Sequence, residues 1–214
     1  MSRLLRFTVL LPLISLLCTC GPAPKKAAEP TAVVGSIRYD EGSQLLESTL
    51  TVSPLPLTPP AVLGTTLREL TAMGPGHYRG RQQTNFPAAI DLNIAGQPAQ
   101  VIRFSPPFSD SLPPTLLTSR TAKIPAMRGG LADNESLVFF LEPEDRSTPK
   151  RILLQGPSNS GVLTLPKQSL ADVKPGRYAA YFVKQQLQKD STASLETSLQ
   201  TEYFTKSVTV EVKD

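Results

Sequence analysis

Few residues of this chain combine a reactive type with the neighbours that catalysis requires. His77 is the only histidine among the 214 residues, so the chain offers a single imidazole base and no histidine-rich metal site. It directly follows Pro75-Gly76, where a turn is expected, and this favours a surface position. There is no G-x-S-x-G serine elbow and no glycine-rich phosphate-binding motif. We therefore predict that the protein is not an enzyme, with no catalytic residue and no cofactor.

Two small groups of acidic residues are candidates for a metal or hydrolase site. Glu142, Glu144 and Asp145 lie within four residues, and paired carboxylates can serve glycoside hydrolysis or bind calcium. Pro143 lies among them where a hairpin is expected to end, which favours a solvated turn. The segment Asp133-Asn134-Glu135 has the same interpretation, so no metal site is predicted.

The best candidate for recognition is a pair of basic residues on one expected strand. Arg79 and Arg81 alternate there, with Tyr78 on the opposite face. The polar segment 188–200 is expected to be a long loop between the last two strands. Such loops can carry recognition, but a simple hairpin tip is the favoured interpretation here. Acidic and basic residues are interspersed along the chain, which argues against a nucleic-acid-binding stripe.

The first twenty residues have the features of an export signal. Arg3 and Arg6 precede an uncharged apolar run over residues 7–17. This run is shorter than the about 20 apolar residues that a membrane-spanning helix needs. Both cysteines, Cys18 and Cys20, lie at the end of the segment, so the remaining chain has no disulfide and no thiol chemistry.

The segment Leu17-Cys18-Thr19-Cys20-Gly21 resembles the lipobox of Gram-negative bacterial lipoproteins, in which a cysteine after two small residues is lipidated and becomes the first residue. The resemblance implies lipidation of Cys20, with Cys18 as a competing acceptor, and attachment to the membrane by lipid. Gly21 after the cysteine implies delivery to the outer membrane, on the periplasmic or the surface side. An ordinary signal peptide with incidental cysteines is the alternative.

Composition divides the chain into a signal, a tether and two β-rich parts. We expect a signal peptide at 1–19 and a lipid-anchored tether at 20–30, where proline, alanine and lysine show no apolar periodicity. Four prolines within 106–114 interrupt the later strand pattern, so a linker at 107–114 separates a β-sandwich at 31–106 from one at 115–214. The expected strands cover 32–39, 48–53, 62–70, 77–84, 89–94, 100–105, 116–124, 136–142, 150–155, 161–165, 177–186 and 203–212. A hairpin turn is expected at 95–98. In 136–142, Leu137, Phe139 and Leu141 face one way and Val138 and Phe140 the other, which predicts a central strand buried on both faces.

One phrase occurs in both parts, as Leu70-x4-Pro75-Gly76-His77-Tyr78 and as Leu170-x4-Pro175-Gly176-Arg177-Tyr178. Pro-Gly favours a type II turn, and the tyrosine behind it can donate its hydroxyl to the turn backbone. This arrangement resembles the tyrosine corner of immunoglobulin-like sandwiches. The resemblance implies two disulfide-free immunoglobulin-like or fibronectin-like modules of the kind found in bacterial surface and periplasmic proteins, with structural tyrosine corners at Tyr78 and Tyr178.

These features favour an all-β, lipid-anchored envelope protein that serves as a non-catalytic structural or protein-interaction module. Its expected partners are the membrane, through the lipid, and an envelope protein, but not nucleic acid. A lipoprotein that binds a glycan or peptide ligand is the first alternative, and an envelope hydrolase is the second.

The lipobox resemblance makes a direct prediction. Cys20→Ala should release the protein from the membrane fraction, because the acyl chains would have no acceptor, and mass spectrometry should find no lipid on the protein. Cys18→Ala is the matched control and should remain membrane-bound. Equal membrane retention of the Cys20→Ala protein would contradict lipidation at this residue.

Overall fold

The computed structural model describes residues 29–214 except 88, 109 and 146, so the signal, Cys20 and most of the expected tether lie outside the described residues. In the described part, regular structure is β apart from a 3-10 turn, Thr71–Met73, and one helical turn, α1 (Lys167–Leu170). The predicted all-β fold is therefore confirmed. Neither of these turns has the length to span a bilayer, and no helix of the described residues qualifies as a membrane span.

One large sheet organises the molecule, and its main strand order is β12-β11-β14-β15-β1-β2-β6-β5. Two strands extend it: β16 pairs with the first part of β14, and β9 pairs with β16. The bounds are β1 (Thr31–Asp40), β2 (Leu45–Ser53), β5 (Arg68–Glu69), β6 (His77–Gln83), β9 (Thr115–Leu117), β11 (Glu135–Pro143), β12 (Lys150–Gln155), β14 (Gly176–Ser191), β15 (Leu195–Phe204) and β16 (Val208–Lys213).

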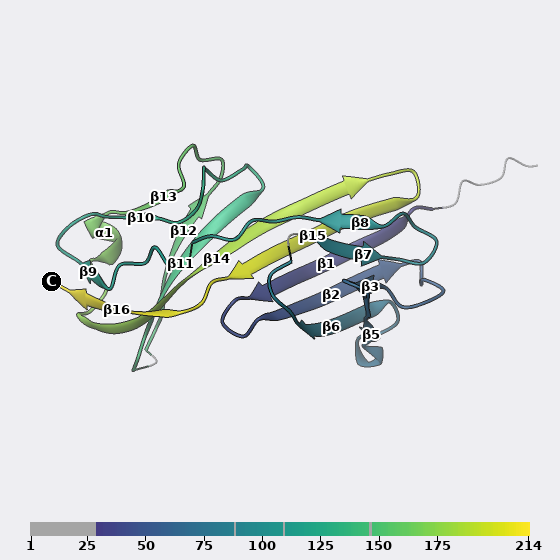
Figure 1. Ribbon diagram of the computed structural model, residues 1–214, viewed down its shortest axis with the longest axis horizontal. Coiled ribbons are helices and arrows are strands. Elements are labelled where there is room, and N and C mark those ends of the chain that lie inside the picture. The colour runs from purple at the N-terminus through teal and green to yellow at the C-terminus, as the bar shows by residue number, and fades with distance from the viewer. Residues whose placement is uncertain (1–28, 88, 109, 146) are drawn as a thin grey trace, which may run out of the picture.

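Two small sheets form a second layer. One joins β10 (Ala122–Pro125) to β13 (Val162–Leu165), and the other has the order β4-β3-β7-β8, with β3 (Ala61–Val62), β4 (Thr65–Thr66), β7 (Ile90–Asn93) and β8 (Gln100–Ile102). Figure 1 shows the β10–β13 pair toward one end of the long axis and the β3–β7–β8 group toward the other.

Each small sheet encloses a hydrophobic core against the inner face of the large sheet. The first core packs Ile37 and Leu50 of the large sheet with Leu92 of β7. The second core packs Phe139 and Phe182 with residues of the β10–β13 pair, and the two phenylalanine rings lie 5.4 Å apart. Full burial of side chains of this size contributes about 1.5–3 kcal/mol each, so both cores are substantial.

The two cores do not correspond to the predicted sandwiches at 31–106 and 115–214. The strand β15 belongs by sequence to the second part, yet it pairs in parallel with β1 and packs Leu195, Leu199 and Tyr203 into the first core. The large sheet therefore runs through both halves of the molecule without a break. The Pro-rich segment 107–114 contains no strand in its described residues, as expected. It does not separate two domains, because β15, which follows it in sequence, pairs with β1, which precedes it.

The polar loop predicted at 188–200 is also corrected. This segment forms the end of β14, a turn at 192–194 and the first part of β15. The inward-facing residues of this part of β15 are Leu195, Thr197, Leu199 and Thr201. Because leucine alternates with threonine there, apolar residues recur only every four positions, and the period of two that identifies a strand is not visible in the sequence.

Three other expected strands are divided, and one of them is 203–212, which contains the end of β15 and most of β16 with a break at 205–207. The segment 62–70 contains the end of β3, then β4 and β5, because Leu63 and Gly64 both adopt a positive φ and make a tight turn. The segment 116–124 is split between β9 and β10, which belong to different sheets.

The two tyrosines of the repeated phrase are both buried but differ in their contacts. The Tyr178 hydroxyl donates to the Lys174 carbonyl oxygen at 2.8 Å, which is the hydrogen bond expected of a tyrosine corner. Tyr78 makes no such bond to its turn within the described residues. There, the Glu69 carboxylate accepts from the Gly76 N–H at 3.2 Å instead. Gly76 has a φ of 82°, and a Cβ at this position would lie 2.6 Å from the Val52 carbonyl oxygen, so glycine is required.

A buried ion pair lies on the inner face of β14. Lys184 is 4% exposed, and its Nζ lies 2.8 Å from Glu135 Oε1 and donates to Ser105 Oγ at 2.7 Å. Loss of one partner would leave a buried charge uncompensated, which typically costs about 3–5 kcal/mol. Lys184 of β14 thereby connects Ser105, which precedes the Pro-rich segment, with Glu135 at the start of β11.

Substitutions of Tyr178 test its contribution to the second core. Tyr178→Phe removes the bond to Lys174 and should lower the free energy of unfolding by about 0.5–1.5 kcal/mol. Tyr178→Ala also opens a cavity and should cost about 3–5 kcal/mol. Chemical denaturation should therefore rank the parent, Tyr178→Phe and Tyr178→Ala in this order of midpoint. Identical midpoints for all three would show that the ring contributes nothing to the core.

Candidate functional site: the open face of the large sheet

The large sheet has one covered face and one open face. Because both small sheets pack against the inner face, the side chains that point the other way meet no second layer formed by the described residues. Directly paired residues share a face, so the register fixes which side chains these are. They are the even-numbered residues of β1, β11 and β15 and the odd-numbered residues of β2, β6, β12 and β14. We call this surface the open face.

Aromatic and arginine side chains gather at the middle of the open face. Phe140 on β11 and Tyr181 on β14 are directly paired, and their rings stack at 4.9 Å with an angle of 4° between planes. The Arg151 guanidinium on β12 lies 5.3 Å from the Phe140 ring centre. On the other side, the Arg38 guanidinium lies 3.6 Å from the ring centre of Phe204 on β15. We call these five residues the aromatic cluster.

The cluster is ordered by contacts beneath and beside it. Val183, two residues after Tyr181 on β14, pairs directly with Phe204 and with Val138. It is 3% exposed, although it points toward the open face. The Tyr181 hydroxyl donates to Glu142 Oε1 at 2.7 Å. Burial, assisted by the hydrogen bond and negative charge of Glu142, raises the pKa of Tyr181 above its ordinary value. The phenol therefore stays neutral and remains a donor throughout the physiological pH range.

The predicted basic patch of Arg79 and Arg81 lies on the same face. In the structure it also includes a shared carboxylate and a third arginine, which the sequence analysis did not identify. Arg81 and Arg79 both approach Glu47 Oε1 on the neighbouring strand, at 2.5 Å and 3.6 Å. The short strand β5 brings Arg68 directly opposite Arg79. A depression of about 440 Å³ is lined by the three arginines together with Thr65, Thr66, Leu70 and Gly80.

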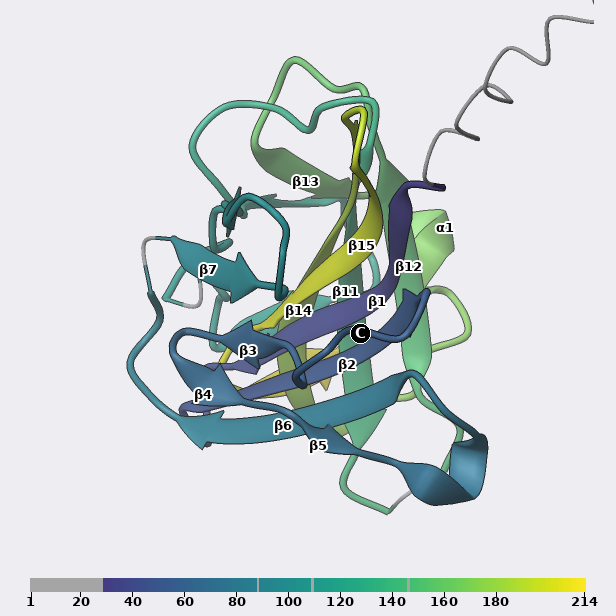
Figure 2. The ribbon, with the colours of Figure 1, turned by 90° about the vertical axis from the view of Figure 1, so that its right-hand side faces the viewer.

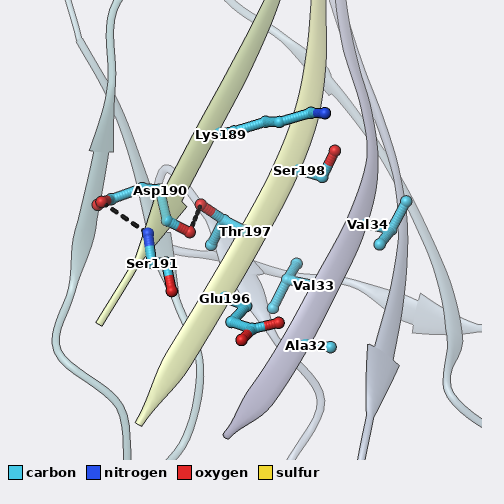
Figure 3. A pocket seen from close by; sticks show the side chains of 9 residues that line it. All are labelled: Ala32, Val33, Val34, Lys189, Asp190, Ser191, Glu196, Thr197 and Ser198. Atoms are coloured by element: carbon cyan, nitrogen blue, oxygen red, sulfur yellow. Dashed lines mark hydrogen bonds between the residues drawn. The ribbon is translucent and has the colours of Figure 1, made fainter. Parts of the chain in front are cut away.

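A second depression, of about 400 Å³, lies where β1 begins beside the tip of the β14–β15 hairpin. Figure 3 shows Lys189, Ser198 and Val34 on three adjacent strands of this groove, with Glu196 and Ala32 closer to the strand ends. The hydrogen bonds drawn there are local: Asp190 accepts from the Ser191 N–H at 2.9 Å and, through its carbonyl, from the Thr197 hydroxyl at 3.5 Å. Because its polar groups bind their own neighbours, they do not converge on one point in the groove.

The residues considered for catalysis are separated and have different partners. His77 Nδ1 lies 3.0 Å from the Thr51 hydroxyl on the open face. Glu142 accepts from Tyr181, Glu144 lies 3.4 Å from Arg177, and Asp145 accepts from the Ser147 N–H. Of Asp133-Asn134-Glu135, Glu135 pairs with Lys184. Among the described residues, no group of three or more histidine, cysteine or acidic side chains is placed to hold a metal ion.

Sequence reasoning missed the aromatic cluster because it assigned Val138 and Phe140 to a second buried face of β11. That assignment is wrong: Leu137, Phe139 and Leu141 are fully buried, whereas Val138 and Phe140 are only half-buried on the open face. Phe140 packs against Tyr181 and Arg151 instead of against another layer.

No family model matches the chain, and no curated protein matches it.

The buried tyrosines give a testable pH dependence. Burial raises the pKa of each of the five tyrosines, and the shift is large for Tyr181 and Tyr203. Their neutral forms favour the folded state, so this stability is fully present below the unfolded pKa of about 10 and is lost as pH rises through the folded values. Tyrosinate absorbance at pH near 10 should be small in the native protein and should increase on addition of denaturant. A native titration like that of free tyrosine would contradict this burial.

Proposed function

We propose that this protein is a lipid-anchored, non-catalytic module of the bacterial envelope that binds a protein partner through its open face. The aromatic cluster is the observation that carries this proposal. Phenylalanine, tyrosine and arginine are residue types enriched in protein–protein interfaces, and here they lie together on a face that no layer of the described residues within 29–214 covers.

The ring geometry favours a protein partner over a glycan. Carbohydrate sites stack a sugar on a free aromatic face. In the register of the sheet, Phe140 has Tyr181 on one side and Arg151 on the other, and Phe204 carries Arg38 on its ring. The guanidinium groups are therefore held over the rings, which orders them as hydrogen-bond donors for a protein carboxylate or carbonyl.

Charges on the rest of this face favour specific docking over general attraction. Arg38 lies between Glu47 and Glu202 in the register, and Arg81 lies on the far side of Glu47. Glu202 also accepts from Gln185 and Gln200 at 2.9 Å and 2.7 Å. Since positive and negative groups alternate across the strands, a partner is recognised by matching this pattern rather than by net charge.

Single exposed apolar side chains extend the surface beyond the cluster. Leu153 is 61% exposed beside Val138, and Val34 is 55% exposed at the far end. An isolated exposed leucine is ordinary, but these lie on one face together with the aromatic cluster. The combined surface has an apolar centre with a polar surround, as interfaces do.

The proposed lipid anchor and the open face are compatible in geometry. The described chain begins at one end of the long axis, and the C-terminus lies at the opposite end (Figure 1). An anchor at Cys20 would hold the molecule by the end where β1 begins. β11 and β12, which carry Phe140 and Arg151, lie in the other half of the molecule (Figure 1) and would be held away from the bilayer, where a partner in the envelope can reach them.

Site-specific photo-crosslinking tests the proposed function. A photoreactive residue at position 153, on the open face, should give a discrete protein adduct in cells. The same residue at Val162, which is 39% exposed on β13 and lies away from this face, is the matched control and should not. Arg151→Glu should abolish the adduct, whereas Arg120→Glu, an equal charge change on another exposed residue, should preserve it. Equal adducts at positions 153 and 162, or none at 153, would contradict a partner on the open face.

A further inference from the structure

The depression between β5 and β6 holds an unusual arrangement of like charges. Arg68 and Arg79 are directly opposite one another across the two strands, and Arg81 lies two residues further along the same side of β6. Like charges in directly opposed positions destabilise a sheet. Retaining two opposed arginines beside a third therefore requires something that offsets their repulsion.

The acidic residues of the protein offset it only in part. Glu47 is shared by Arg79 and Arg81 through one oxygen, Oε1. Glu69, next to Arg68 in sequence, is directed to the other side, where it accepts from the Gly76 N–H. Within the described part of the chain, Arg68 makes no ion pair. Three guanidinium groups thus face one carboxylate, which leaves a net positive charge in the depression.

The shape and lining of the depression suit a compact anion. Its volume is about 440 Å³, and Thr66 adds a hydroxyl group to the arginines, whereas the Thr65 hydroxyl donates to Gln82 Oε1 at 3.0 Å. The side chain of Leu67 packs against Gly80, where an added Cβ would lie only 2.4 Å from Leu67 Cδ2, so the glycine lets the β4–β5 segment lie close to β6. Arginine binds phosphate with paired N–H donors, and three arginines around one pocket match a group with several anionic oxygens.

The register places this depression near the start of β1. Arg79 pairs with Thr49, and Thr49 pairs with Ser36, which is five residues from Thr31. With about 3.3 Å per residue along a strand and about 5 Å between strands, Arg79 lies roughly 20 Å from Thr31. Figure 2 shows β4, β5 and β6 side by side at one edge of the molecule, and Figure 1 shows β5 and β6 in the half where β1 begins. The ten residues 21–30 can extend at most about 33–36 Å.

We propose that Arg68, Arg79 and Arg81 form a binding site for the phosphate group of an anionic membrane lipid. This inference rests on the lipid-anchor part of the proposed function, because an anchor at Cys20 brings this end of the molecule to the bilayer surface. The arginine site then makes a second contact with the membrane and sets the orientation of the open face. Each arginine adjacent to an anionic surface should strengthen binding about fivefold, and salt should weaken it.

The test uses the Cys20→Ala protein, which has no acyl acceptor at this position, with vesicles of phosphatidylcholine alone or with added phosphatidic acid. We expect flotation only with phosphatidic acid. Arg68→Gln should reduce the affinity about fivefold, while Arg120→Gln, which removes the same charge from an exposed site elsewhere, should leave it unchanged. Arg68 has no partner within the described residues, so its replacement should not disturb the fold, and an unchanged melting temperature verifies this.

The outcomes separate the possible phosphate sources. Stabilisation by inorganic phosphate that depends on Arg68, without vesicle binding, would overturn the membrane source in favour of a soluble phosphate compound. Equal vesicle binding by Arg68→Gln and Arg120→Gln, or no binding to either form of phosphate, would overturn the site itself. Failure of the lipid anchor is recognised separately, by fractionation of the Cys20→Ala protein, and failure of partner binding by crosslinking at position 153.

Discussion

The structure depends on one shared strand, β14, whose sixteen residues supply backbone hydrogen bonds to both halves of the large sheet. Its residues 176–180 pair with β16, and its residues 183–191 pair with β15 on the same edge, while β11 occupies the opposite edge. A strand that changes partner along its length must continue straight through the junction. The two cores are therefore joined by a continuous backbone ladder rather than by a hinge.

This constraint explains the polar group at the junction. On the inner face of β14, Tyr178, Ala180 and Phe182 enter the second core, and Lys184 follows them at 4% exposure. The pairing of its amine with Glu135 and Ser105 satisfies the charge where the apolar layer is interrupted. Thr205 lies in the short connection between β15 and β16 and takes the place of a strand residue opposite Phe182. Its N–H donates to the Phe182 carbonyl, and its hydroxyl accepts from the Phe182 N–H.

Local features of the fold could be predicted from sequence, and long-range pairings could not. β12 has the predicted bounds, and the turn around Gly96 lies between β7 and β8, because apolar alternation and turn residues act over a few positions. The parallel pairing of β1 with β15 joins residues more than 150 positions apart, and nothing in either segment encodes it locally. For the same reason Arg79 and Arg81 could be singled out on one strand, whereas Arg68 could not be placed opposite them.

The aromatic cluster buries a residue of the sheet, and it also lies among exposed apolar residues that this burial does not explain. Phe140, Tyr181 and Phe204 surround Val183 in the register, and Val183 is 3% exposed. This burial alone would explain the three rings on a face that no second layer covers in the described part of the chain. It does not explain Leu153 or Val34, which lie on the same face and are more than half exposed. Their exposed apolar surface is unfavourable in water, and burial against a partner would remove it from water. A surface that combines a rigid, ordered centre with exposed apolar positions around it is suited to docking, because the partner supplies the missing burial and meets a centre that is already ordered.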